Sequence, residues 1–235
     1  MKAIICAAGE GKRLRPYTNE IPKCLLNVGN KTIIEYILNN ISEAGIKDVL
    51  IVVGYKKEAI VNKIGNKYKN CKINYVISEE YSKADNMHSL WLAMKNVDEE
   101  IIFFNADILF SANTLKEMAN KNGNVIAIAS EIKKDSMKVK IKNGFVKELG
   151  KNLGGEVQGD AIGIYKLSKK TARNYFDIAN EIVLRGELNT SFVHPINELA
   201  TSFNFQSFMI RDKWAEIDSI EDYKKAKDVV REILN

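Results

Sequence analysis

Short apolar runs alternate with amphipathic segments over the first hundred residues, and this alternation restricts the fold more than any other feature. The run at 49–53, for example, is closed by Gly54. Continuous apolar runs of this length are typical of strands covered on both faces, and their alternation with helices implies right-handed crossovers in a parallel sheet. The pattern predicts strands at 3–6, 49–53, 73–77 and 101–104, and helices at about 33–44, 56–69 and 87–96.

The pattern changes beyond residue 130. An alternating run at 138–141, the turn pair Asn143-Gly144 and a second run at 145–149 predict a β-hairpin. A strand at 160–167, helices at about 168–185 and 191–203, and a final helix from about residue 220 complete the predicted elements. We therefore expect a single α/β domain over 1–235. Its core is a doubly wound, mainly parallel, Rossmann-like sheet, with a small hairpin and helical subregion over the site.

Composition narrows the possible partners. The chain has 235 residues and a net charge of +5, and its lysines are interleaved with acids rather than gathered in a basic run, which argues against nucleic acid and fits a small anionic substrate. Cys6, Cys24 and Cys71 are too few and too far apart for a disulfide framework or a zinc site.

No apolar run reaches membrane-spanning length, and the first strand begins directly after Lys2. We expect a cytoplasmic protein without nucleic-acid or membrane partners, either a monomer or a homodimer.

The first apolar run leads into a glycine-rich loop that carries three cations. Gly9 and Gly11 let the backbone approach an anion closely, while Lys12, Arg13 and Arg15 supply positive charge. This composition predicts a phosphate-binding loop at the carboxyl end of the first strand. From the motif alone, a glycine-rich turn with solvated cations is the alternative.

Spacing excludes two familiar phosphate loops. A Walker loop aligned on Gly11-Lys12 needs a glycine at position 6, where Cys6 stands, and a Ser or Thr at position 13, where Arg13 stands. A dinucleotide fingerprint needs a small residue where Leu14 stands, and Pro16 soon interrupts any helix. The loop therefore belongs to neither class.

Two aspartates are candidate metal ligands. Asp107 follows the buried run at 101–104, where a carboxylate either caps a turn or binds a hard cation beside phosphate. Ser111 is a better cap for the next helix, and because the phosphate-binding loop is expected nearby, we favour the metal role for Asp107. Ser219 can cap the final helix in the same way, which leaves Asp218 without an obvious structural duty.

A lysine behind a proline is a further candidate. Pro22 fixes the local backbone and can aim Lys23 at a ligand. An exposed lysine at a turn is the alternative.

Several of these segments together resemble one family, the nucleotidyltransferases that activate sugar phosphates and small phosphorylated alcohols. The resemblance implies a glycosyltransferase-A-like sheet. Cys6 departs from the family pattern, which usually has Leu at that position. The matching segments are 1–16, Pro22-Lys23, 53–55, 105–107 and 216–219.

The middle of the chain separates two branches of this family. Sugar-1-phosphate enzymes usually carry a glycine-rich stretch before the helix at 87–96, whereas the stretch at 84–93 looks like that of cytidylyltransferases acting on phosphocholine, aminoethylphosphonate and similar compounds. Two features depart from the pattern: Asn105 stands where the sugar-activating branch usually has Gly, and the region 180–205 matches no one substrate. The resemblance therefore implies CTP-dependent transfer to a small phosphorylated alcohol such as phosphocholine. The alternatives are a sugar-1-phosphate nucleotidylyltransferase using UTP, dTTP or GTP, and a regulatory nucleotide-binding module without turnover.

The resemblance also implies roles in catalysis. The acceptor phosphate attacks the α-phosphorus of CTP and expels pyrophosphate, so negative charge must be neutralised. Mg²⁺ held by Asp107 and Asp218 would bridge the reacting phosphates, Lys12 and Arg13 would neutralise pyrophosphate, and Lys23 would hold the acceptor phosphate.

Binding residues are expected on both sides of this centre. The nucleotide is expected against Ala7, Ala8, Gly9 and Gly11, with Ser89 reading the edge of the base. For the acceptor, an aromatic face and a carboxylate together suit an ammonium head group. The acceptor candidates are Asp160, Tyr165, Glu198 and Trp214.

Overall fold

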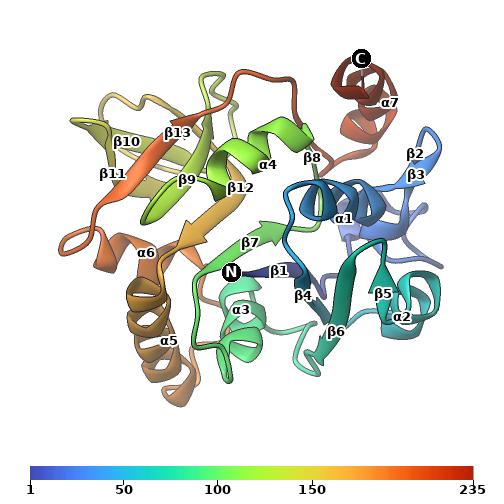
Figure 1. The fold of residues 1–235 in the computed structure, drawn as a ribbon, viewed down its shortest axis with the longest axis horizontal. Coiled ribbons are helices and arrows are strands. Elements are labelled where there is room, and N and C mark those ends of the chain that lie inside the picture. Colours follow the sequence, from blue (N-terminus) through green and yellow to red (C-terminus); the bar gives the residue numbers. More distant parts are fainter. Residues whose placement is uncertain (235) are drawn as a thin grey trace.

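The computed structural model describes residues 1–234, which are built around a 10-stranded mixed sheet (Figure 1). The strands are β1 (Lys2–Ala7), β2 (Asn27–Val28), β3 (Lys31–Thr32), β4 (Asp48–Val53), β5 (Lys67–Tyr68), β6 (Cys71–Ile77), β7 (Ile101–Asn105), β8 (Ile108–Leu109), β9 (Asn124–Ala129), β10 (Lys138–Lys142), β11 (Phe145–Gly150), β12 (Gly159–Leu167), β13 (Phe205–Met209) and β14 (Ala215–Glu216). The helices are α1 (Ile33–Glu43), α2 (Lys57–Ile64), α3 (Asn86–Met94), α4 (Ala112–Ala119), α5 (Lys169–Leu184), α6 (Val193–Leu199) and α7 (Ile220–Leu234). The large sheet has the order β10-β11-β13-β9-β12-β7-β1-β4-β6-β5.

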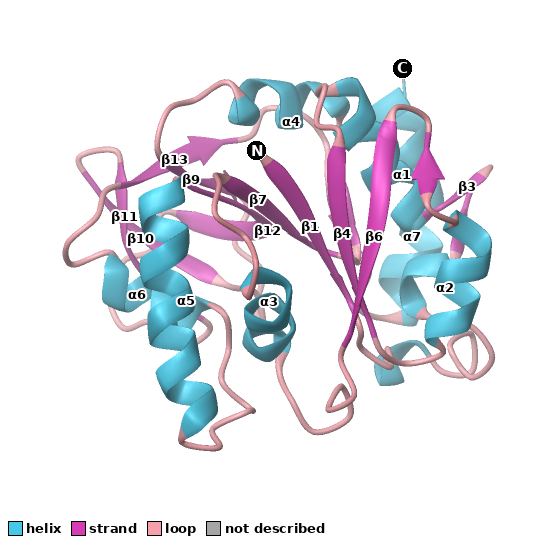
Figure 2. Cartoon of the chain, turned by 60° about the horizontal axis from the view of Figure 1, so that its bottom comes forward, coloured by secondary structure: helices cyan, strands magenta, loops and turns pink. Residues whose placement is uncertain are grey.

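Alternation along β1 explains why helices cover both faces of the sheet. Ala3, Ile5 and Ala7 lie in one core with α1, α2, α4 and α7, whereas Ile4 lies in the other with α3, α5 and α6. The two helical layers are visible on opposite faces in Figures 1 and 2. The expected α/β class is confirmed.

The two halves of the sheet differ in strand direction. β1 pairs in parallel with β4 and β7, and β4 pairs in parallel with β6, as the alternation predicts. Beyond β7, β12 runs antiparallel between β7 and β9, and β13 returns parallel to β9. The predicted hairpin is present as β10 and β11, and Asn143 and Gly144 both adopt the positive φ angles that its tight turn requires.

Two predicted helices are shorter than expected. Instead of continuing to residue 69, α2 ends at Ile64, because Gly65 has a φ of 69° and the chain turns into β5, which pairs with β6. The helix expected at 191–203 is α6 and covers only Val193–Leu199. Within residues 1–234, no helix is both long and apolar enough to cross a membrane.

A short two-stranded ribbon brings the end of the chain to the carboxyl ends of the central strands. β14 pairs antiparallel with β8, which places Glu216 opposite Ile108. Directly after this pair, the Ile217 amide donates to the carbonyl of Asp107 at 2.9 Å. Residues 107 and 218 are therefore neighbours in space, although far apart in sequence.

Candidate active site

The glycine-rich loop forms the floor of a cavity of about 460 Å³ beyond the end of β1. Gly11 has a φ of 62°, and a Cβ there would lie 3.0 Å from the Cβ of Lys23, so glycine is needed both for the turn and for this close approach. Thr18 fixes the loop, because its hydroxyl donates to the Gly11 carbonyl at 2.8 Å. Within residues 1–234, the amides of Gly9 and Gly11 donate to no protein acceptor, which leaves them available to an anion.

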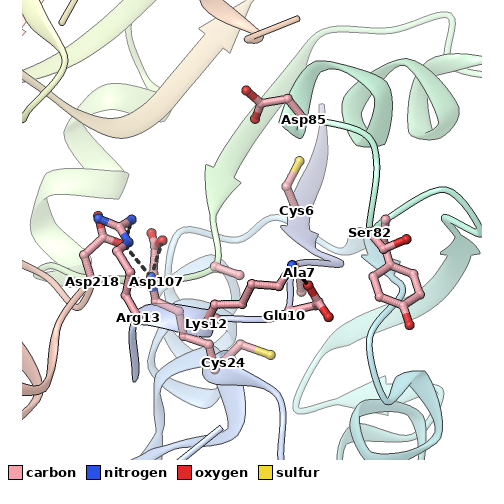
Figure 3. A pocket seen from close by; sticks show the side chains of 15 residues that line it. Cys6, Ala7, Glu10, Lys12, Arg13, Cys24, Ser82, Asp85, Asp107 and Asp218 are labelled. Carbon is pink, nitrogen blue, oxygen red and sulfur yellow. Dashed lines mark hydrogen bonds and ion pairs between the residues drawn. The ribbon is translucent and has the colours of Figure 1, made fainter. Parts of the chain in front are cut away.

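Lys23 joins the two aspartates that the sequence singles out. Its Nζ donates to Oδ2 of Asp107 at 2.8 Å and to Oδ1 of Asp218 at 2.7 Å. Burial alone would lower the pKa of Lys23, but the two carboxylates outweigh it and raise that pKa above its usual value. Arg13 adds a second cation, 2.9 Å from Oδ1 of Asp218. Figure 3 shows Arg13, Asp107 and Asp218 gathered at one end of the cavity.

Glu216 is a third carboxylate at this centre. Burial, together with the charges of Asp107 and Asp218, raises the pKa of Glu216 to about 7. The metal ligands predicted from the sequence are Asp107 and Asp218 and do not include Glu216. The alternation Glu216-Ile217-Asp218 could have predicted it. In an extended segment, residues 216 and 218 lie on the same face, opposite to the fully buried Ile217.

The three carboxylates fit a divalent cation. Asp107, Glu216 and Asp218 each offer an oxygen, and these oxygens lie within 4.8 Å of one another. Oδ1 of Asp107 is buried and has no hydrogen-bond partner among the described residues. An all-oxygen donor set with a spare buried carboxylate oxygen matches the preference of Mg²⁺.

Two cysteines lie beside the site. Cys6 and Cys24 both line the cavity, and Cys24 is also part of the buried core. Burial, with a smaller contribution from the charge of Asp107, raises the pKa of both thiols to about 12. At neutral pH both therefore stay protonated.

The residues expected to bind the nucleotide line two adjoining cavities. Ala7, Gly9 and Gly11 line the 460 Å³ cavity, and Ala8 and Ser89 line a smaller one of about 220 Å³ that shares Gly9 with it. The carboxylate of Asp85 accepts a hydrogen bond from the Asn86 amide at the start of α3, and Asp85 lines both cavities.

Lys12 and Arg13 differ in their surroundings. Both line the 460 Å³ cavity, but Lys12 is paired with Glu10 while Arg13 contacts Asp218. Both side chains are more than half exposed, at 63% and 69%, so they are free to move toward a ligand.

A second cavity, of about 540 Å³, lies beside the first, and only one of the four expected acceptor residues lines it. Tyr165 is in its lining. Asp160 is fully buried behind the wall, where its Oδ2 accepts a hydrogen bond from the Lys133 amide at 2.7 Å. Glu198 is exposed on α6, and Trp214 packs on the core beneath the Lys133 ammonium, 4.5 Å from its ring centroid. Neither Glu198 nor Trp214 lines either cavity.

Comparisons with known proteins identify relatives of this chain. Residues 2–146 match the model of the family described as nucleotidyl transferase. A CTP:phosphoglutamine cytidylyltransferase from Campylobacter jejuni is 28% identical over 251 residues, which cover 94% of this chain and 97% of that protein. A bifunctional IPC transferase and DIPP synthase from Aquifex aeolicus is 29% identical over 233 residues; they cover 96% of this chain but 50% of that protein.

A solved structure shares the fold. The CTP:phosphocholine cytidylyltransferase from Streptococcus pneumoniae superimposes with a TM-score of 0.82 at 24% identity, covering 97% of this chain and 98% of that one. Relatives named as sugar-1-phosphate nucleotidyltransferases also match. The names of these proteins therefore share one reaction class, nucleotidyl transfer, but differ in the acceptor.

Proposed function

Because the chain belongs to the nucleotidyl transferase family, we propose that it transfers the cytidylyl group of CTP to a small phosphorylated alcohol or related phosphonate, such as phosphocholine, and releases pyrophosphate. One observation carries the proposal: Arg13, Asp107 and Asp218 line both the 460 Å³ cavity and the 540 Å³ cavity. The charged centre therefore lies where two ligands in adjoining cavities would meet. The first cavity receives CTP, and the second receives the acceptor.

The reaction joins two anions, so its barrier is mainly electrostatic. An oxygen of the acceptor phosphate forms a bond to the α-phosphorus of CTP, while the bond from that phosphorus to the pyrophosphate oxygen breaks. Loop amides bind the phosphates, and Arg13 and Lys12 neutralise the departing pyrophosphate. Lys23 lines the first cavity but contacts Asp107 and Asp218, which line both, and from there it holds the acceptor phosphate where it meets the α-phosphate. The chain needs no nucleophile of its own, in agreement with the protonated thiols.

A magnesium ion completes this proposal. Asp107 and Asp218 would hold it, with Glu216 as a third oxygen donor. When bound, the ion supplies positive charge to the reacting phosphate oxygens.

Two lines of support favour CTP. The stretch before α3 lacks the glycines of the sugar branch, and a relative covered over 97% of its length is named for CTP. The small residues Ala7, Ala8 and Gly9 leave room for a base, and Ser89 offers a hydroxyl to its edge. A sugar-1-phosphate nucleotidylyltransferase using UTP, dTTP or GTP is the second candidate, favoured by the relatives of that class and by a cavity large enough for a sugar.

A pyrophosphate-release assay tests the proposal. Purified protein with Mg²⁺ and each of CTP, UTP, dTTP and GTP is screened against phosphorylated amino alcohols, polyols and sugars. We expect release with CTP and a small phosphorylated acceptor. A preference for another nucleotide with a sugar 1-phosphate selects the second candidate, and no release with any pair contradicts both.

Lys23→Ala tests the assignment of the acceptor side. This variant is expected to lose pyrophosphate release while calorimetric titration shows CTP affinity close to that of the wild type. Lys227→Ala, on the exposed face of α7, is the matched control and should behave as the wild type. If Lys23→Ala loses CTP affinity as well as pyrophosphate release, Lys23 binds the nucleotide rather than the acceptor.

A further inference from the structure

A polar wall separates the 220 Å³ cavity, which Ser89 lines, from the 540 Å³ cavity proposed for the acceptor. Two of its residues lie at the start of α3 and two at the end of β7. A nucleotide with its base beside Ser89 and its α-phosphate beside Asp107 therefore has to pass along this wall. The residues that line both cavities are Asp85, Asn86, Asn105 and Asp107.

Three of the four side chains already have protein partners. Asp85 and Asn86 each accept a hydrogen bond from a backbone amide, at 2.6 and 3.0 Å, and Asp107 accepts one from Lys23 at 2.8 Å. Within residues 1–234, the side-chain amide of Asn105 makes no hydrogen bond, although it follows four fully or nearly fully buried residues of β7. Polar groups at such positions normally have a partner, so this amide is available to a ligand.

The neighbouring strands make room for Asn105 and hold it in place. Gly163 lies beside it on β12, where the pairing with β9 is interrupted by a bulge, and has a φ of 84°. A Cβ at Gly163 would lie 2.9 Å from Nδ2 of Asn105 and 3.1 Å from its Cβ, so any side chain there would displace the amide. On the other side, Asn105 pairs with Cys6 of β1. The amide is therefore fixed between two strands at the edge of both cavities.

This position matches the ribose of the nucleotide. Asn105 and Asp107 are two residues apart, so their Cα atoms are separated by at most about 7 Å. A single ribose joins a base to an α-phosphate over a similar span. The amide of Asn105 has no charge to offer a phosphate, but it has N–H donors and a carbonyl acceptor. It can therefore bond both hydroxyls of a cis-diol, donating to one and accepting from the other.

We propose, resting on the function proposed above, that Asn105 hydrogen-bonds the 2′- and 3′-hydroxyls of the nucleotide ribose and thereby makes the enzyme select ribonucleotides over deoxyribonucleotides. A ligand without one of these hydroxyls leaves part of the amide unpaired in a site from which the ligand excludes water, and this costs binding free energy. Asn105 is thus a specificity-determining residue on the nucleotide side, and the 2′-deoxy nucleotide dTTP is a poor substrate.

Calorimetric titration of the wild-type protein with CTP and with its 2′-deoxy and 3′-deoxy analogues tests this directly. We expect each analogue to bind about tenfold or more weakly than CTP, the range for leaving a hydrogen-bonding group unpaired. With one fixed acceptor, kcat/KM should fall in the same order. Equal affinities for all three nucleotides overturn the inference but leave nucleotidyl transfer intact. No pyrophosphate release with any acceptor contradicts the proposed function instead, and the binding ratios still decide the inference without turnover.

Asn105→Ala provides a second readout. The variant should bind CTP about tenfold more weakly and should no longer distinguish CTP from its deoxy analogues, an effect that a purely structural role would not produce. Asn174→Ala is the matched control, because Asn174 is also partly exposed but lies on α5 and lines none of the three cavities. A wild-type preference for CTP retained in Asn105→Ala, or a loss confined to the KM of the acceptor, would contradict the assignment of Asn105.

Discussion

Replacing Lys23 with Met should destabilise the protein in the absence of metal. The Nζ of Lys23 lies 2.8 Å from Asp107 and 2.7 Å from Asp218, and the side chain is only 15% exposed. Removing it leaves two partly buried carboxylates facing each other, and Arg13 can reach only Asp218. Breaking a fully buried pair costs about 3–5 kcal/mol. Since Arg13 remains and both aspartates are partly solvated, we expect a loss of about 2–3 kcal/mol.

Thermal denaturation with a chelator present measures this effect. For a chain of this size, about 2–3 kcal/mol corresponds to a fall in Tm of roughly 4–12 °C. Added Mg²⁺ should restore more stability to Lys23→Met than to the wild type, because the ion no longer competes with an ammonium for the same oxygens. Lys227→Met, on the exposed face of α7, controls for the change of side chain.

Two results would refute this reasoning. The first is a Tm for Lys23→Met in chelator equal to that of the control. The second is a smaller stabilisation of the variant than of the wild type by Mg²⁺. Either would mean that Lys23 and the cation do not share the carboxylates.

Two further predictions concern pH and packing. The pKa of Glu216 is about 7 in the folded protein and near 4.5 when unfolded, so in chelator the folded state binds the extra proton, and stability falls as pH rises from about 4.5 to 7. In Glu216→Gln, the difference in unfolding free energy between pH 5 and pH 8, measured by urea denaturation, should be smaller by about 2 kcal/mol. An unchanged difference would contradict the assignment. Gly54→Ala would place a Cβ 2.6 Å from Tyr81 and 2.9 Å from the carbonyl of Ala8. It should cost about 1–3 kcal/mol and weaken CTP binding in calorimetry, whereas Gly154→Ala, where a Cβ meets nothing within 4 Å, should do neither.

Local patterns in the sequence predicted the first half of the fold well. Strands β1, β4, β6 and β7 are short apolar runs whose crossovers leave few choices of order. The antiparallel insertion of β12 between β7 and β9 could not be predicted in this way, because it depends on pairing between segments distant in sequence. The prediction of a helix at 56–69 is too long, because Gly65 ends α2 and the chain turns there into β5.

The candidate site also combines residues whose positions local sequence pattern predicts with residues whose positions depend on distant pairing. The loop and Asp107 follow a strand directly, so their place at the sheet edge could be predicted from local pattern. The cap offered by Ser219 makes Asp218 a candidate from local sequence, but its position beside Asp107 depends on the pairing of β14 with β8, which no local pattern predicts. Trp214 and Glu198 were chosen by residue type, which does not reveal that a lysine covers the first and that the second faces solvent.

The most direct test is the rate of pyrophosphate release from CTP with Mg²⁺ by Asp107→Asn, measured beside the wild type with a phosphorylated amino alcohol as acceptor. Asparagine keeps the size and one oxygen but removes the charge that holds the cation. The account predicts a fall of about a hundredfold or more, in line with the loss of comparable electrostatic groups in enzymes. A rate equal to that of the wild type would contradict it.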